Sequence, residues 1–167
     1  MKKKISSICT LLACIAAFAA CGNDDGDAGS AGWVNVKNVY TTGCKTTETA
    51  NASQKTRSFF EDMGYKEYVE YTSKDNGYVH VTHHNALFNC CSDVIDVDVS
   101  QGLGSIIVTE TENNYAICNC ICPFDVSFEI GPLEMGHEYN VVIKSGGTDG
   151  VSFSFTYPSS GKVEVRE

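Results

Sequence analysis

From Trp33 to the C-terminus, apolar residues recur mainly at every second position, in short runs separated by turn residues. A period of two is typical of β-strands with one buried face, whereas amphipathic helices repeat every three or four residues. Only Ser53–Met63 favours a short helix. Strands are predicted around Trp33, Val34, Val36 and Val39, and then over residues 65–71, 78–84, 94–99, 105–110, 115–122, 124–130, 139–144, 151–155 and 162–166.

Turn residues between these runs indicate how the strands are connected. Asn76-Gly77 between two alternating runs is a strong hairpin signal and predicts positive φ at both residues. Gly102-Leu103-Gly104 and the segment 146–150 mark further hairpins, while Pro123, Pro132 and Gly136 are expected to end strands. The pattern therefore predicts an all-β fold, an antiparallel β-sandwich with Ig-like or small-barrel variants, as one domain over residues 33–167.

The N-terminus differs in composition from this domain. Lys2, Lys3 and Lys4 precede an apolar segment over residues 5–20, which is typical of a secretory signal peptide. That segment is shorter than the about 20 apolar residues of a membrane-spanning helix. Phe18-Ala19-Ala20-Cys21 resembles the lipobox of bacterial lipoproteins, although leucine is more usual where Phe18 stands. The resemblance implies a signal peptide over residues 1–20 and lipidation of Cys21. An ordinary secretory signal cut near Ala20 is the alternative.

The residues after Cys21 are small and acidic, and none of residues 22–32 has a large apolar side chain. Because such a segment cannot bury apolar surface, residues 21–32 are predicted to carry the lipid and form a flexible tether. An acidic tract in this position also resembles the export signal that takes some Gram-negative lipoproteins to the outer face of the outer membrane. The expected location is the cell envelope, lipid-anchored at the outer membrane, on its periplasmic or exposed face.

Charge restricts the partners of the mature chain. The formal net charge is −9 for the whole sequence, and loss of the three leader lysines lowers it to −12. A strongly negative protein is repelled by phosphate backbones and anionic membrane surfaces. We therefore expect no nucleic-acid partner, and attachment to the membrane through the lipid anchor.

Six cysteines remain outside the leader and the anchor: Cys44, Cys90, Cys91, Cys118, Cys120 and Cys122. An even number in an exported domain favours disulfides. Along a strand, Cys118, Cys120 and Cys122 would lie on one face with neighbouring Cα atoms about 6.6 Å apart, close to the upper limit for a disulfide. Each is therefore expected to pair outside its own group. Three bridges to Cys44, Cys90 and Cys91 are possible, and the sequence leaves their connectivity open.

A metal site is the alternative use of the same cysteines. Soft thiolates select zinc, copper or iron–sulfur clusters, and His80, His83 and His84 lie just before Cys90. Strand alternation places His80 and His84 on one face, where they are candidate accessory ligands of a Zn or Cu site. The spacing matches neither a zinc ribbon nor a ferredoxin. A reducible pair used in thiol–disulfide exchange is a third interpretation.

Three short motifs carry a further resemblance: Gly43-Cys44-Lys45, Phe88-Asn89-Cys90-Cys91, and the segment from Cys118 to Asp125 with the pattern Cys-x-Cys-x-Cys-Pro-Phe-Asp. Together they resemble a group of cysteine-rich bacterial envelope lipoproteins, over most of the mature domain. The resemblance implies that all six cysteines act as one set, and it implies no activity.

Other candidate residues have simpler explanations. Asp93, Asp96 and Asp98 could bind calcium, but alternation places Asp96 and Asp98 on an outward face. Tyrosines at positions 65, 68, 71 and 78 suit a carbohydrate- or protein-binding face as well as ordinary packing. His83 or His84 could pair with Cys90 as a nucleophile, without a third group to orient the histidine. The sequence contains no nucleophile elbow, phosphate-binding loop or dinucleotide fingerprint.

The sequence therefore predicts a membrane-anchored envelope lipoprotein that is not an enzyme. Its β-sandwich, braced by disulfides and without a cofactor, would serve as a binding or structural module for a protein or glycan of the envelope. The alternative function is binding of a thiophilic metal, Zn or Cu, outside the cytoplasm. Thiol–disulfide exchange is the weaker enzymatic alternative.

Overall fold

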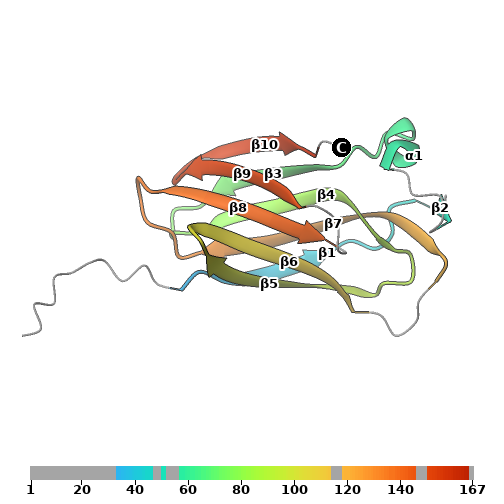
Figure 1. Cartoon of the computed structure of the whole chain (residues 1–167), viewed down its shortest axis with the longest axis horizontal. Helices are drawn as coiled ribbons and strands as arrows, with labels where there is room; N and C mark the ends of the chain where they lie inside the picture. The colour runs from blue at the N-terminus through green and yellow to red at the C-terminus, as the bar shows by residue number, and fades with distance from the viewer. Residues whose placement is uncertain (1–32, 47–49, 52–56, 114–117, 146–149, 166–167) are drawn as a thin grey trace, which may run out of the picture. The chain divides into compact units, whose positions relative to one another are not determined.

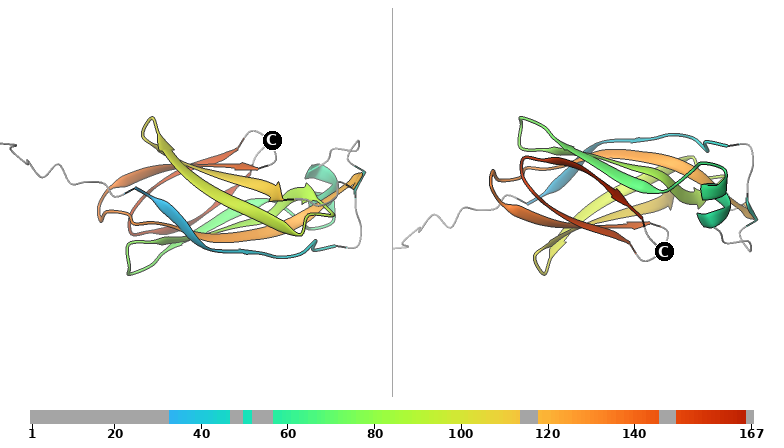
Figure 2. Two further views of the ribbon diagram at one scale, coloured as in Figure 1. Left: turned by 90° about the horizontal axis from the view of Figure 1, so that it is seen from below. Right: turned by 90° about the horizontal axis from the view of Figure 1, so that it is seen from above.

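The computed structural model describes residues 33–46, 50–51, 57–113, 118–145 and 150–165. Two β-sheets pack face to face in these residues, as Figures 1 and 2 show. The fold is a β-sandwich rather than a closed barrel, which confirms the predicted class. The leader, Cys21 and the tether lie outside the described residues. Among those described, no helix is long and apolar enough to span a membrane.

The larger sheet has the strand order β1-β7-β4-β3-β10. The short β2 also pairs with β7, at the first residues of β7, whereas β1 pairs with its later residues. Its members are β1 (Asn35–Thr41), β2 (Ala50–Asn51), β3 (Tyr68–Ser73), β4 (Val79–Asn89), β7 (Cys120–Gly131) and β10 (Ser160–Glu164). The smaller sheet has the order β5-β6-β8-β9 and consists of β5 (Val94–Gly102), β6 (Ser105–Asn113), β8 (Glu138–Ser145) and β9 (Val151–Thr156).

The core lies between the inner faces of the two sheets, because side chains alternate along each strand. On β7, Phe124, Val126, Phe128 and Ile130 are all buried. The smaller sheet contributes buried side chains from the facing side of the core: Ile95, Ile106, Val108, Val141, Ile143, Phe153 and Phe155. The hydrophobic alternation in the sequence therefore identifies the buried face correctly.

Three local predictions need correction. β6 and β8 run parallel, so the sandwich is not antiparallel throughout. Between these two strands the chain crosses to the other sheet and forms β7, and alternation within a strand does not reveal its direction. At the Asn76-Gly77 turn only Gly77 has positive φ, because β3 and β4 are joined by a loop over residues 74–78 rather than by a two-residue turn. The predicted helix, α1 (Arg57–Asp62), ends one residue before the expected Met63, and positions 53–56 of the prediction lie outside the described residues.

The prediction that Pro123 ends a strand is wrong, because this residue lies within β7. It stands opposite Leu87 of β4, and its carbonyl oxygen accepts a hydrogen bond from the Lys45 nitrogen on the other side, at 2.9 Å. The nitrogen and carbonyl of one strand residue point to the same side of the strand. The missing N–H of Pro123 therefore faces the irregular segment between β1 and β2, and the ladder with β4 stays intact.

Candidate functional site

All six cysteines of the domain form disulfides: Cys44–Cys122, Cys90–Cys120 and Cys91–Cys118. The paired Cα atoms are 5.8, 5.6 and 5.7 Å apart, within the usual range for a disulfide. Each bridge joins one of Cys44, Cys90 and Cys91 to one of Cys118, Cys120 and Cys122, as the spacing predicted. The three bridges are nested, with Cys44–Cys122 outermost in the sequence.

The disulfides hold the first residues of β7 on both sides. Cys90 follows β4 directly, and its backbone nitrogen donates to the Cys120 oxygen at 3.2 Å, so the two cysteines are cross-strand neighbours. Cys44 lies on the opposite side of β7, in the segment that follows β1. Cys122 is fully buried, whereas the other five cysteines are partly exposed. This arrangement fixes one end of the larger sheet covalently.

Within this cluster, one sulfur atom each from Cys90, Cys91 and Cys118 lie within 4.8 Å of one another. The candidate histidine ligands are elsewhere. His84 precedes Cys90 by six positions, which is about 20 Å along an extended strand, and its ring stacks on Tyr68 with centroids 4.4 Å apart. His80 lies nearer the start of β4, still further from Cys90, and contacts Thr82. Both side chains lie on the outer face of β4, as alternation predicted, but the structure does not bring them to the cysteines.

A second polar cluster is buried in the core, between the two sheets. His83, on the inner face of β4, is only 1% exposed, and both of its ring nitrogens contact carboxylates. Nδ1 lies 2.9 Å from Glu110 Oε2 of β6, and Nε2 lies 2.9 Å from Glu67 Oε1, just before β3. His83 of the larger sheet therefore contacts two carboxylates, one on the smaller sheet and one in the segment that leads into β3 of the larger sheet.

Two further side chains complete this buried charge network. Arg57 Nε of α1 donates to Glu67 Oε2 at 2.6 Å, which ties the helix to the sandwich. The Ser145 hydroxyl, at the end of β8, donates to Glu110 Oε2. Glu110 Oε1 has no hydrogen-bond partner among the described residues. The cluster thus places the carboxyl groups of Glu67 and Glu110 against one imidazole and one guanidinium.

The network shifts the pKa values of its members. Burial alone would lower the pKa of His83, but the charge and hydrogen bond of Glu110, together with those of Glu67, raise it to about 9. Burial would raise the pKa of Glu67, but its hydrogen bond with His83 and the charges of His83 and Arg57 lower it below the ordinary value. His83 is therefore a cation at neutral pH, in spite of its burial.

The buried network is suited to hold structure rather than to catalyse a reaction. Both nitrogens of His83 are occupied, and the Ser145 hydroxyl contacts the carboxylate instead of the imidazole. A nucleophile must contact its base and reach a substrate, and these groups are closed off. The pairing of His83 or His84 with Cys90 that the sequence suggested is not formed, because Cys90 is bonded to Cys120.

Sequence reasoning missed the two glutamates, although a signal was present. Glu110 continues the inward-facing positions of Ile106 and Val108, and His83 continues those of Val79 and Val81. A charged group in phase with a buried apolar stripe must find a partner inside the fold. The sequence could therefore have suggested a buried pair between the histidine on one apolar stripe and Glu110 on the other.

The remaining candidates are dispersed. Tyr71 stacks on Phe153 and packs at a tilt against Phe155 in the core region, whereas Tyr78 lies under the Lys37 ammonium on the outside. The four tyrosines thus do not form one binding face. The three aspartates of the possible calcium site are exposed, as the outward-face interpretation predicted for Asp96 and Asp98, and Asp96 accepts a hydrogen bond from Asn113.

The fold and these two clusters define a β-sandwich domain braced by disulfides, with a buried charge network between its sheets. Comparisons of the chain with protein-family models, with curated proteins and with solved structures find no match.

The two inner disulfides are expected to substitute for each other. With one of them intact, the other closes a loop of only a few residues, so Cys90→Ala/Cys120→Ala and Cys91→Ala/Cys118→Ala should each lower the free energy of unfolding by about 2 kcal/mol. Loss of both pairs should cost about 5 kcal/mol, more than the sum of the separate losses. Urea unfolding of the mature protein measures these values. Simple additivity would contradict the redundancy.

Stability should fall at alkaline pH because of His83. The folded state holds this proton to higher pH than the unfolded chain, so its contribution is complete below pH about 6.5 and is lost as the pH rises through about 9. Urea unfolding should show a decrease of up to about 3 kcal/mol between these pH values. His83→Gln should remove this step and His80→Gln should keep it. A step that persists in His83→Gln would assign it to another group.

Proposed function

We propose that this chain is a lipid-anchored lipoprotein of the cell envelope, whose disulfide-braced β-sandwich is a non-enzymatic binding or structural module. The observation that carries the proposal is the lipobox-like Phe18-Ala19-Ala20-Cys21, placed between an apolar leader and a domain whose six cysteines are all paired. Disulfides form and persist in oxidising compartments, so their presence supports export.

The distribution of chemical groups in the domain supports a non-enzymatic role. The charged groups with the strongest interactions, Glu67, His83 and Glu110, are buried and engaged with one another. Partly buried groups such as Lys45 and Asp125 are also paired, with 2.8 Å between the ammonium and the carboxylate. A module of this kind presents a stable outer surface to a protein or glycan and needs no reactive side chain.

A second candidate function is binding of a thiophilic metal ion, and the proximity of the Cys90, Cys91 and Cys118 sulfur atoms favours it. If these cysteines were reduced, three thiolates from two neighbouring segments would face one small volume. Soft ligands of this type suit Zn or Cu(I). The disulfide-bonded and metal-bound states exclude each other, because each uses the same sulfur atoms.

The anchor is tested by replacing the proposed lipid acceptor. When the full precursor is expressed in a host that processes lipoproteins, the wild-type N-terminal peptide should carry acyl groups by mass spectrometry, and the protein should partition into detergent. Cys21→Ser should lose both properties, because no thiol remains to accept lipid. Cys14→Ser, which replaces a cysteine within the leader, should keep both. An acyl-free mature wild-type protein would instead indicate an ordinary secretory signal.

The state of the domain cysteines separates the module from the metal-binding alternative. Alkylation of the exported protein after denaturation without reductant should label none of the six domain cysteines, and native mass spectrometry should find no bound ion. Free thiols together with an ion at fixed stoichiometry would favour metal binding. In that case Cys118→Ser should abolish retention of the ion, whereas Cys44→Ser, outside the group of three sulfur atoms, should keep it.

A further inference from the structure

The three most exposed large apolar side chains of the described residues are Leu103, Trp33 and Met135, which are 107%, 84% and 79% exposed. We call these three residues the apolar tip. Single exposed apolar residues are ordinary on a protein surface. Three that exceed all others in exposure, and that include the single tryptophan of the chain, require an explanation if they lie together.

The strand pairing places all three residues at one end of the sandwich. Trp33 precedes β1, whose first residue, Asn35, pairs with Gly131 at the end of β7. Met135 lies in the connection from β7 to β8, and Leu103 lies at the tip of the β5–β6 hairpin. Figure 1 shows this hairpin turn and the β7–β8 connection at the end opposite α1.

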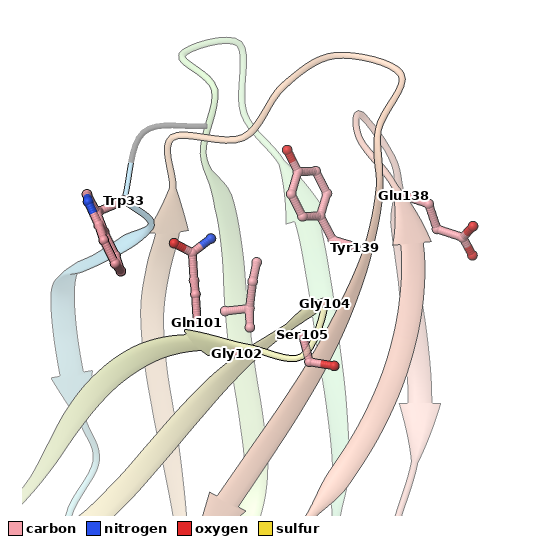
Figure 3. A pocket seen from close by; sticks show the side chains of 8 residues that line it. Trp33, Gln101, Gly102, Gly104, Ser105, Glu138 and Tyr139 are labelled. Carbon is pink, nitrogen blue, oxygen red and sulfur yellow. The ribbon is translucent and has the colours of Figure 1, made fainter. Parts of the chain in front are cut away.

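Hydrogen bonds and a surface hollow connect these segments. The backbone nitrogen of Val34 donates to Gln101 Oε1 at 3.2 Å, which links the start of β1 to the β5–β6 hairpin. An open hollow of about 480 Å³ lies between Trp33, the hairpin turn and Tyr139. Figure 3 shows Trp33, Gln101 and Tyr139 around this hollow. Trp33 and Leu103 therefore belong to one surface.

Leu103 is unfavourable where it stands, for two independent reasons. Its φ is +51° and that of Gly104 is +77°, so the turn between Gly102 and Ser105 needs two left-handed residues. Asparagine or glycine is preferred at the first of these positions, and a leucine there is strained. Its side chain is also fully in water. A residue that violates both backbone and solvation preferences marks a place where a contact in the working state is expected.

We propose that the apolar tip contacts the surface of the membrane that holds the lipid of Cys21. This inference rests on the proposed function, because the short segment between a lipidated Cys21 and Trp33 is the reason for choosing the membrane as the partner of the apolar tip. Only the segment 22–32 separates Cys21 from Trp33, and a flexible chain of that length has a root-mean-square span of about 20 Å. A lipid on Cys21 would thus keep the apolar tip close to the bilayer at all times, whereas a free partner must arrive by diffusion.

The chemistry of the apolar tip fits a neutral lipid surface. Tryptophan and tyrosine are enriched where membrane meets water, because their rings are apolar and carry a polar group. The net charge of −12 after loss of the leader lysines opposes binding to anionic lipid. The contact should therefore depend on burial of the three apolar side chains, change little with salt, and be strongest on zwitterionic bilayers.

The single tryptophan makes the contact directly measurable. The mature lipidated protein is inserted into vesicles of zwitterionic phosphatidylcholine, with and without bromine on the acyl chains. If the apolar tip meets the bilayer, Trp33 emission should shift to shorter wavelength and be quenched ~2-fold by the brominated lipid. Leu103→Asp and Met135→Asp should each remove most of this quenching while the protein stays on the vesicles through its lipid.

Met63→Asp is the matched control, since Met63 follows α1 at the opposite end and is 37% exposed. It should leave the quenching unchanged. If the protein is acylated and bound to vesicles but Trp33 remains unquenched, the apolar tip does not touch lipid, and this inference is wrong while the anchor stands. A blue shift that rises with protein concentration without lipid would assign the tip to a second copy. Absence of acylation would overturn the anchor and this inference together.

Discussion

The contact between His83 of β4 and Glu110 of β6 is the deepest polar link between the two sheets, and much of the surrounding structure depends on its being complete. Two carboxylates and two cations lie in or against the core, and burying such charges is unfavourable unless they are paired. Removal of one partner of a buried ion pair typically costs about 3–5 kcal/mol. Correct packing of the sheets, of the segment before β3 and of α1 is therefore required at the same time, because each contributes one charged group.

The disulfides constrain a different part of the structure from the buried charge network. Cys44–Cys122 and Cys90–Cys120 join segments of the larger sheet around the start of β7, and Cys91–Cys118 joins the β4–β5 connection to the β6–β7 connection. They limit the freedom of β4, β7 and the segment after β1, but none of them joins a strand of one sheet to a strand of the other. That task falls to the apolar core, to the buried charge network, and to hydrogen bonds such as the one from the Asn89 nitrogen to Glu112. The covalent and electrostatic constraints thus complement each other.

The sequence predicts the strands and the buried faces well, because burial imposes a period of two that is visible in one chain. It predicts the pairing of the cysteines between two groups, since the reach of a disulfide disfavours pairing within Cys118, Cys120 and Cys122. It does not predict the order of the strands, because the parallel alignment of β6 and β8 depends on a chain crossing between sheets. For the same reason it does not identify the partners of His83: Glu67 and Glu110 are 16 and 27 residues away, on separate elements.

Backbone conformation offers a further distinction between structural and functional explanations. Three non-glycine residues of the described chain have positive φ: Asn38, Asn85 and Leu103. The two asparagines stand at the register shifts of β1 and β4, and asparagine tolerates this conformation because its side chain forms local hydrogen bonds. Asn85 is held in addition by hydrogen bonds with Lys45, Lys66 and Asp125, which are distant in the sequence. Leu103 has no such chemistry and its side chain is fully exposed, so the proposed contact with the membrane, which would bury this side chain, gives the residue a role that the fold alone does not supply.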